Sequence, residues 1–192
     1  VTLTWDNGAG LRFTQIVAVD DNFMFTVTQR VDNTGGTAVT LFPYGRVLRT
    51  GTPDTLGFFV LHEGPLGVFG GTLTELSYDD VRDDGQITER STGGWIGITD
   101  KFWLVALVPD QAQPFDAGFR YRVTTDDQYQ IDILRTGVET APGATVEVTN
   151  RLFAGAKEVD TLERYNQSLG IDRFDLTIDW GWLFFLTKPI FI

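Results

Sequence analysis

Hydrophobic and polar residues alternate along four segments of the chain, at residues 23–31, 119–124, 129–134 and 145–149. A period of two places successive side chains on opposite faces of a β-strand, so each segment is predicted to be a half-buried strand. Residues 102–108 are instead apolar throughout, and Pro109 follows them. This stretch is predicted to be a central strand that is buried on both faces.

Turn sequences rich in Asn, Asp and Gly separate the predicted strands. They are Asp6-Asn7-Gly8, Asn33-Thr34-Gly35-Gly36, Asp84-Gly85 and Ala141-Pro142-Gly143. Asn-Gly and Asp-Gly supply the positive φ that tight hairpins need. Many short strands joined by such turns indicate a mainly β protein, an antiparallel sandwich.

The pattern changes after Gly155 from strands to a helix. Val159, Leu162, Tyr165 and Leu169 recur at the three- and four-residue spacing of an amphipathic helix, which is predicted over residues 157–169. Gly170 is well placed to end it. Such a helix either covers an edge or face of the sheet or serves as a docking surface.

The last segment, residues 179–192, is rich in Trp and Phe but is shorter than the roughly 20 apolar residues that a bilayer span needs. Asp179 is a candidate cap for a helix that lies in a membrane–water interface. The residues expected at the interface are Trp180, Trp182, Leu183, Phe184, Phe185 and Phe191, with Pro189 ending or kinking the helix. The alternative is a C-terminal core element of a soluble protein.

The charge of the chain bears on its partners. With 15 basic and 26 acidic residues, the formal net charge is −11, and the basic residues do not cluster. Nucleic acid and anionic lipid headgroups repel such a domain, so no nucleic-acid partner is expected. The low Lys and Arg content also favours a loop on the far side of a membrane from the cytoplasm.

Catalytic and metal-binding chemistry finds little support in the sequence. The chain has no cysteine, and His62 is its single histidine. Nucleophile-elbow, phosphate-loop and dinucleotide-binding motifs are absent. The acidic run that includes Asp79, Asp80, Asp83 and Asp84 lacks the spacing of a calcium loop and is expected to be a solvated loop. We therefore expect no metal, no cofactor and no enzymatic activity.

The C-terminal segment, residues 153–192, carries a family resemblance. The residues concerned are Phe153-Ala154-Gly155-Ala156-Lys157-Glu158, Leu162, Tyr165, Asp179-Trp180-Gly181-Trp182 and Lys188-Pro189-Ile190-Phe191. They resemble the end of the large periplasmic domain of bacterial YidC-type membrane protein insertases (YidC/Oxa family). Residues 94–98 running into 102–109 are similar to the family's central strand pair, and residues 25–28 with the Asn33 turn to its early hairpin. Ala156 departs from the pattern, because proline is common there.

The resemblance implies a twisted antiparallel β-supersandwich, similar to galactose mutarotase, with C-terminal amphipathic helices. Residues 1–155 are then expected to form the sandwich, residues 156–170 a helix packed on it, and residues 171–192 a linker and an interfacial helix at the membrane surface. The implied role is insertion and folding of inner-membrane proteins, with the domain on the periplasmic side. The implied partners are nascent membrane proteins and accessory subunits of the Sec translocon, docking at Lys157, Glu158, Leu162 and Tyr165.

The rival interpretation is a carbohydrate- or peptide-binding sandwich, because sugar-binding and aldose-epimerase sandwiches are similar to the family fold. Epimerases of that kind need two histidines beside a carboxylate, and His62 alone cannot form that pair. A non-catalytic cleft remains open. Trp5, Trp95 and Trp103 are its candidate stacking residues, with core packing as the alternative for each.

Overall fold

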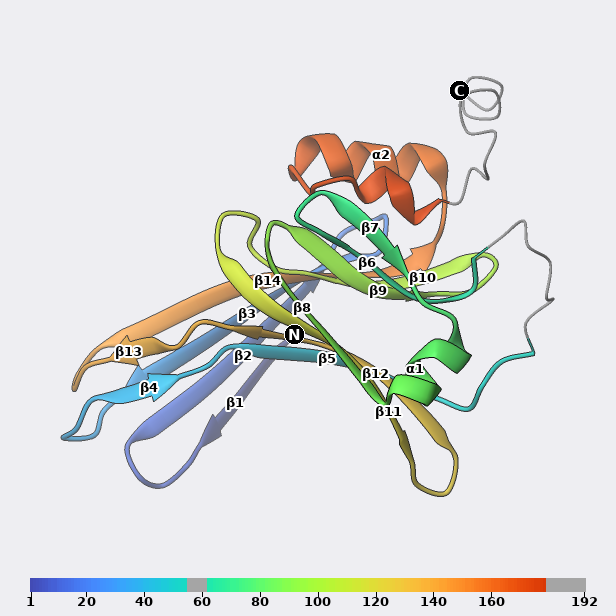
Figure 1. The fold of residues 1–192 in the computed structure, drawn as a ribbon. Helices are drawn as coiled ribbons and strands as arrows, with labels where there is room; N and C mark the ends of the chain where they lie inside the picture. The colour runs from blue at the N-terminus through green and yellow to red at the C-terminus, as the bar shows by residue number, and fades with distance from the viewer. Residues whose placement is uncertain (55–61, 179–192) are drawn as a thin grey trace.

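A computed structural model describes residues 1–54 and 62–178, which form three layers (Figure 1). A large β-sheet lies in the middle. Two helical elements near the C-terminus cover one of its faces, and a smaller sheet packs against the other. All strand pairs are antiparallel, as the turn sequences predicted.

The large sheet has eight strands, and the smaller one has four. In spatial order the large sheet contains β1 (Thr2–Asp6), β2 (Leu11–Val19), β3 (Met24–Asn33), β14 (Thr145–Ala156), β10 (Trp103–Val108), β9 (Gly94–Thr99), β6 (Gly64–Phe69) and β7 (Thr72–Glu75). The smaller sheet contains β5 (Tyr44–Thr50), β12 (Asp127–Arg135), β11 (Pro114–Val123) and β8 (Gln86–Thr92). A two-stranded ribbon pairs β4 (Val39–Leu41) with β13 (Val138–Thr140).

The alternating segments all form strands, which confirms those predictions. The apolar stretch at residues 102–108 also forms a central strand, β10, between β14 and β9. Its start differs from the prediction, because Phe102 and Trp103 are 64% and 61% exposed. Burial begins at Leu104, where the helical layer and the smaller sheet begin to cover the two faces.

Helix α2 (Val159–Ser168) confirms the predicted C-terminal helix, and Gly170 follows it with φ +61°. The acidic run, expected as a loop, instead forms helix α1 (Tyr78–Asp84). Ser77 caps this helix reciprocally: its Oγ accepts from the N–H of Asp80, and the Asp80 carboxylate accepts from the N–H of Ser77. Tyr78 and Val81, three residues apart, bury one side of the helix.

Two apolar cores lie on opposite faces of the large sheet. One core joins that sheet to α2 and to the short 3₁₀-helix η1 (Phe174–Thr177) around Trp95, Phe153 and Phe174. The other joins it to the smaller sheet and α1 around Phe115, Phe119 and Tyr129. The middle sheet is therefore buried on both faces wherever both outer layers reach it.

The segment after α2 corrects one expectation. Residues 171–178 were predicted to begin a linker, but Ile171 and Phe174 are 1% and 0% exposed. The Phe174 ring makes edge-to-face contacts with Trp95 and Phe153, with ring centroids 5.7 and 5.8 Å apart. The chain therefore stays in the core through η1. Residues 179–192, including the whole predicted interfacial helix, lie outside the described part.

The middle strands are staggered, and this stagger creates an overhang. Strand β10 pairs with residues 151–156 of β14, whereas β3 pairs with residues 145–153. The sheet formed by β1, β2, β3 and the first half of β14 thus continues past the end of β10 at Val108. Figure 1 shows these strands extending to the lower left, past the smaller sheet.

Candidate functional site: an apolar groove on the overhanging sheet

The overhang exposes an apolar row on the face that elsewhere packs against the smaller sheet. Trp5 pairs with Phe13, Phe13 with Val31, and Val31 with Val146, so these four side chains cross four adjacent strands. The Trp5 and Phe13 rings stack with centroids 5.2 Å apart. Because alternate side chains point to opposite faces, all four line one surface.

A second wall stands opposite this sheet. It consists of Leu41, Phe42, Pro43 and Tyr44 from the β4–β5 segment, together with Val138. The space between this wall and Phe13, Val31, Val146 and Val148 has a volume of about 210 Å³. A neighbouring hollow of about 270 Å³ over Trp5, Phe13 and Val31 shares lining residues with it. The two hollows form one groove across the overhang, called the overhang groove below.

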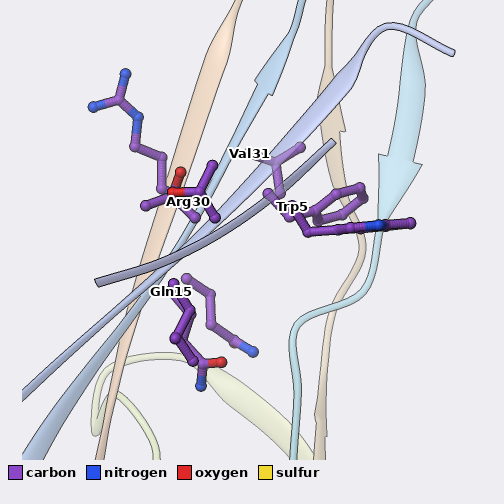
Figure 2. A pocket seen from close by; sticks show the side chains of 9 residues that line it. Trp5, Gln15, Arg30 and Val31 are labelled. Carbon is purple, nitrogen blue, oxygen red and sulfur yellow. The ribbon is translucent and has the colours of Figure 1, made fainter. Parts of the chain in front are cut away.

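Polar groups in the overhang groove are few (Figure 2). Gln29 donates from Nε2 to the Tyr44 carbonyl oxygen at 3.1 Å, and its buried Oε1 has no hydrogen-bond partner. Figure 2 shows Arg30 pointing away from Trp5 and Gln15, and its guanidinium pairs with Asp32 at 2.8 Å. The groove thus offers apolar contact with isolated amide groups.

Electrostatics in the overhang groove do not suit acid–base catalysis. None of its lining residues is Asp, Glu, His or Lys. Burial raises the pKa of the Tyr44 phenol, and the nearby Asp132 carboxylate raises it further. Tyr44 therefore stays protonated at neutral pH, far from the pKa that a general base needs. The groove can bind a ligand, but it lacks groups for proton transfer.

Strand β1 adds an open sheet edge beside the overhang groove. Val1 and Val17 exchange both backbone hydrogen bonds, at 2.7 and 2.8 Å. The antiparallel alternation then turns the backbone groups of Thr2, Thr4 and Asp6 away from β2. Within the described ranges, no strand pairs with this outer edge. An extended chain can add to such an edge by main-chain hydrogen bonds.

The residues predicted to dock a partner fall into two groups. Leu162 and Tyr165 are 0% and 5% exposed, because they attach α2 to the large sheet. The Tyr165 hydroxyl donates to the Asp20 carboxylate at 2.7–2.8 Å. Lys157 and Glu158 instead lie in the connection that precedes α2, where Glu158 is exposed. Only these two offer side chains near the surface.

The remaining candidate residues are scattered. Trp95 is fully buried, whereas Trp5 and Trp103 are about 60% exposed and lie on different parts of the sheet. His62 places Nε2 3.2 Å from the Pro65 carbonyl oxygen. Over residues 1–54 and 62–178, no three His, Asp or Glu side chains gather as metal ligands. In the same ranges, no helix is both long and apolar enough to cross a membrane.

Comparison with known proteins identifies the family. A family model described as the YidC periplasmic domain matches residues 1–192. The chain belongs to the YidC periplasmic domain family. A protein of Methylorubrum extorquens (strain PA1) named "Membrane protein insertase YidC" is 50% identical over 202 residues, covering 100% of this chain and 33% of that protein. A Cereibacter sphaeroides (strain ATCC 17029 / ATH 2.4.9) protein of the same name is 47% identical, with 100% and 34% coverage.

The chain thus spans about a third of the length of these YidC relatives. Solved structures support the fold. A galactose mutarotase related enzyme from Lactobacillus acidophilus superposes with a TM-score of 0.56 at 13% identity, over 80% of this chain and 66% of that one. The galactosidase domain of an alpha-galactosidase-sucrose kinase gives 0.55 at 14%, over 85% and 25%. The predicted mutarotase-like sandwich is confirmed.

Most of the overhang groove was not found from the sequence. Of its residues only Trp5 was named as a candidate for binding, and it was named as an isolated aromatic. Phe13, Val31 and Val146 each have a polar neighbour on both sides, Arg12 and Thr14 around Phe13 for example, which is a usable signal for a half-exposed strand. What brings them together is the register between strands, which alternation along one strand does not encode.

Proposed function

We propose that this chain is a non-catalytic periplasmic domain of a membrane protein insertase. In this proposal it assists the insertion and folding of inner-membrane proteins by holding an extended apolar segment in the overhang groove. Membership of the YidC periplasmic domain family and relatives named insertases support the general role. The apolar row Trp5–Phe13–Val31–Val146 beside the open edge of β1 is the observation that carries the specific role.

An extended peptide suits this surface for a physical reason. Its main chain can pair with Thr2, Thr4 and Asp6 at the edge of β1, while alternate side chains reach the apolar row. A segment of a nascent membrane protein is apolar and gains from leaving water. Sugar binding needs several convergent polar groups for the hydroxyls, and the groove presents few. We therefore favour a polypeptide over a sugar.

Photo-crosslinking in the full-length insertase tests this proposal. A photoreactive amino acid is placed at Val31, in the groove, or at its neighbour Arg30, whose side chain points to the opposite face. We expect crosslinks to nascent membrane proteins from position 31 and few from position 30. Crosslinks from position 31 that stay within the insertase polypeptide would mean that another part of the protein fills the groove, which contradicts the proposal.

Docking of Sec translocon accessory subunits is proposed separately, at the connection that contains Lys157 and Glu158. The support is its position: it precedes α2 at one end of the large sheet, and Glu158 is exposed there. Because Leu162 and Tyr165 are core residues, a partner can contact only the residues around the start of α2 without opening the core. This role concerns a different surface from the overhang groove.

A further inference from the structure

A second exposed apolar surface lies at the opposite end of the large sheet from the overhang. Phe102, in the β9–β10 turn, and Trp103, the first residue of β10, are 64% and 61% exposed, and Phe23, in the β2–β3 turn, is 58% exposed. Lys101 is exposed beside them, with Nζ 5.1 Å from the Phe102 ring centroid. These four residues are called the aromatic rim below.

Strand register places the aromatic rim at one end of the sheet. Trp103 pairs with Ala156 at the end of β14, and the Phe102 carbonyl oxygen accepts from the N–H of Lys157 at 2.9 Å. On the other side of β14, the Phe23 carbonyl oxygen accepts from the N–H of Ala154 at 3.2 Å. The two turns therefore flank the last residues of β14.

Backbone conformation and hydrogen bonds order both turns of the aromatic rim. Phe23 has φ +66°, a backbone conformation that residues other than glycine seldom adopt. The Asp20 carboxylate accepts from the N–H of Asn22 and of Met24, both at 2.9 Å, and so fixes the turn around it. In the other turn, the N–H of Asp100 donates to the Trp103 carbonyl oxygen at 2.9 Å. Large aromatic side chains held in water by ordered turns indicate a contact surface.

Charges of both signs lie at this end of the sheet. The chain carries −11 overall and only three lysines. Lys101 is in the aromatic rim, and Lys157 is hydrogen-bonded through its N–H to the Phe102 carbonyl oxygen. Asp100 is neutralised by Arg49 at 2.7 Å. Exposed aromatic rings beside a lysine are typical of headgroup depth in a bilayer. The exposed carboxylates of Asp20, Asp21 and Glu158 at the same end favour a zwitterionic over an anionic lipid surface.

The path of the chain also indicates a membrane at this end of the domain. In Figure 1 the coloured ribbon that follows α2 ends on the side of the molecule where α2 begins. The residues that follow in the sequence contain Trp180, Trp182, Phe184 and Phe185, which are predicted to lie in a membrane interface. A membrane that meets this segment would approach the domain from the end that carries the aromatic rim.

We propose that the aromatic rim rests on the outer surface of the membrane, with Phe102, Trp103 and Phe23 at headgroup depth and Lys101 toward the lipid phosphates. The occupant is a lipid bilayer. The overhang, at the other end of the sheet, then faces away from the lipid. This inference goes beyond the proposed function and does not depend on what fills the overhang groove.

The test measures how deeply the aromatic rim of the 192-residue chain enters a lipid bilayer. Because the chain has no cysteine, Phe102→Cys labelled with an environment-sensitive fluorophore reports one position alone. Phe42→Cys, at a phenylalanine that is 60% exposed at the overhang, is the matched control. With phosphatidylcholine vesicles we expect a blue shift and quenching by lipid-borne quenchers at position 102 and neither at position 42. Vesicle binding without a blue shift at position 102 would overturn the proposal, because the C-terminal segment would then bind alone.

A paired substitution supplies an independent readout. Removing two exposed aromatic side chains with Phe102→Ser and Trp103→Ser is expected to lower the vesicle partition coefficient at least about tenfold. The control pair Ile16→Ser and Leu134→Ser, each at a 39% exposed side chain outside both the overhang groove and the aromatic rim, is expected to change it by less than about twofold. Equal effects of both pairs refute the proposal. A second outcome also refutes it: the unsubstituted chain sediments as a dimer, and only the Phe102→Ser/Trp103→Ser substitution abolishes that dimer. A second copy of the chain would then cover this surface.

Discussion

Replacing Phe174 by Ala tests whether the segment after α2 belongs to the core. The side chain is 0% exposed and packs edge-to-face on both Trp95 and Phe153. Its backbone N–H donates to Asn166 Oδ1 at 3.0 Å, which ties η1 to α2. Truncation removes the apolar transfer term, leaves a cavity and loses two aromatic contacts. Together these effects are expected to cost about 4 kcal/mol of unfolding free energy.

The assay is urea unfolding of the complete chain followed by far-UV circular dichroism, because a change beside Trp95 would disturb tryptophan fluorescence. The midpoint is expected to fall while the slope stays the same, since the surface exposed on unfolding hardly changes. Phe42→Ala, at a 60% exposed phenylalanine, is the control and is expected to cost less than about 0.5 kcal/mol. A loss below about 1 kcal/mol for Phe174→Ala would falsify the reasoning and restore the linker interpretation.

Three further predictions follow from other contacts. Burial raises the pKa of Asp20, but hydrogen bonds from the Tyr165 hydroxyl and from the N–H groups of Met24 and Asn22 outweigh it and lower that pKa. The stabilisation is therefore present above the pKa of Asp20 in the unfolded chain and is lost as the pH falls through its pKa in the folded protein. Tyr165→Phe is accordingly expected to cost about 1 kcal/mol of unfolding free energy at pH 7 and less below about pH 4. Thermal melts of the unsubstituted chain and the Tyr165→Phe variant across that pH range check this. A Tm difference that grows as the pH falls contradicts it. Charge reversal at Lys157 or Glu158 is expected to reduce co-purification with Sec translocon subunits more than it lowers Tm, although Glu158 also accepts a hydrogen bond from Thr161 Oγ1 at 3.3 Å. Unchanged co-purification would refute that docking surface. A panel of sugars is expected to leave tryptophan fluorescence and Tm unchanged, whereas a rise in Tm would favour the sugar-binding alternative.

The fold was predictable where the pattern of residues close together in the sequence determines the secondary structure. Alternation located β3, β11, β12 and β14, and the Leu162–Tyr165 stripe located α2. The family motifs then supplied the arrangement of these elements. Helix α1 was missed because its seven residues contain mostly acids. Its determinants were nonetheless present as the Ser77–Asp80 capping box and the Tyr78–Val81 pair.

The site depended on contacts between distant segments, which local patterns do not contain. Trp5 and Val146 are far apart in sequence, and only the register through Phe13 and Val31 aligns them. Phe174 was assigned to a linker because the family resemblance implied a linker and an interfacial helix over residues 171–192. Its burial follows from the space between α2 and the sheet, which exists only once both have packed.

The burial of Phe174 also has a mechanical consequence. A flexible tether would let a domain swing and would absorb any pull on it as chain entropy. Here the last described turn is locked between Trp95, Phe153 and Asn166. A load applied at Ile178 therefore meets the stiffness of the packed sheet within a few residues. The segment from Ile171 to Ile178 and the large sheet are expected to move as one body.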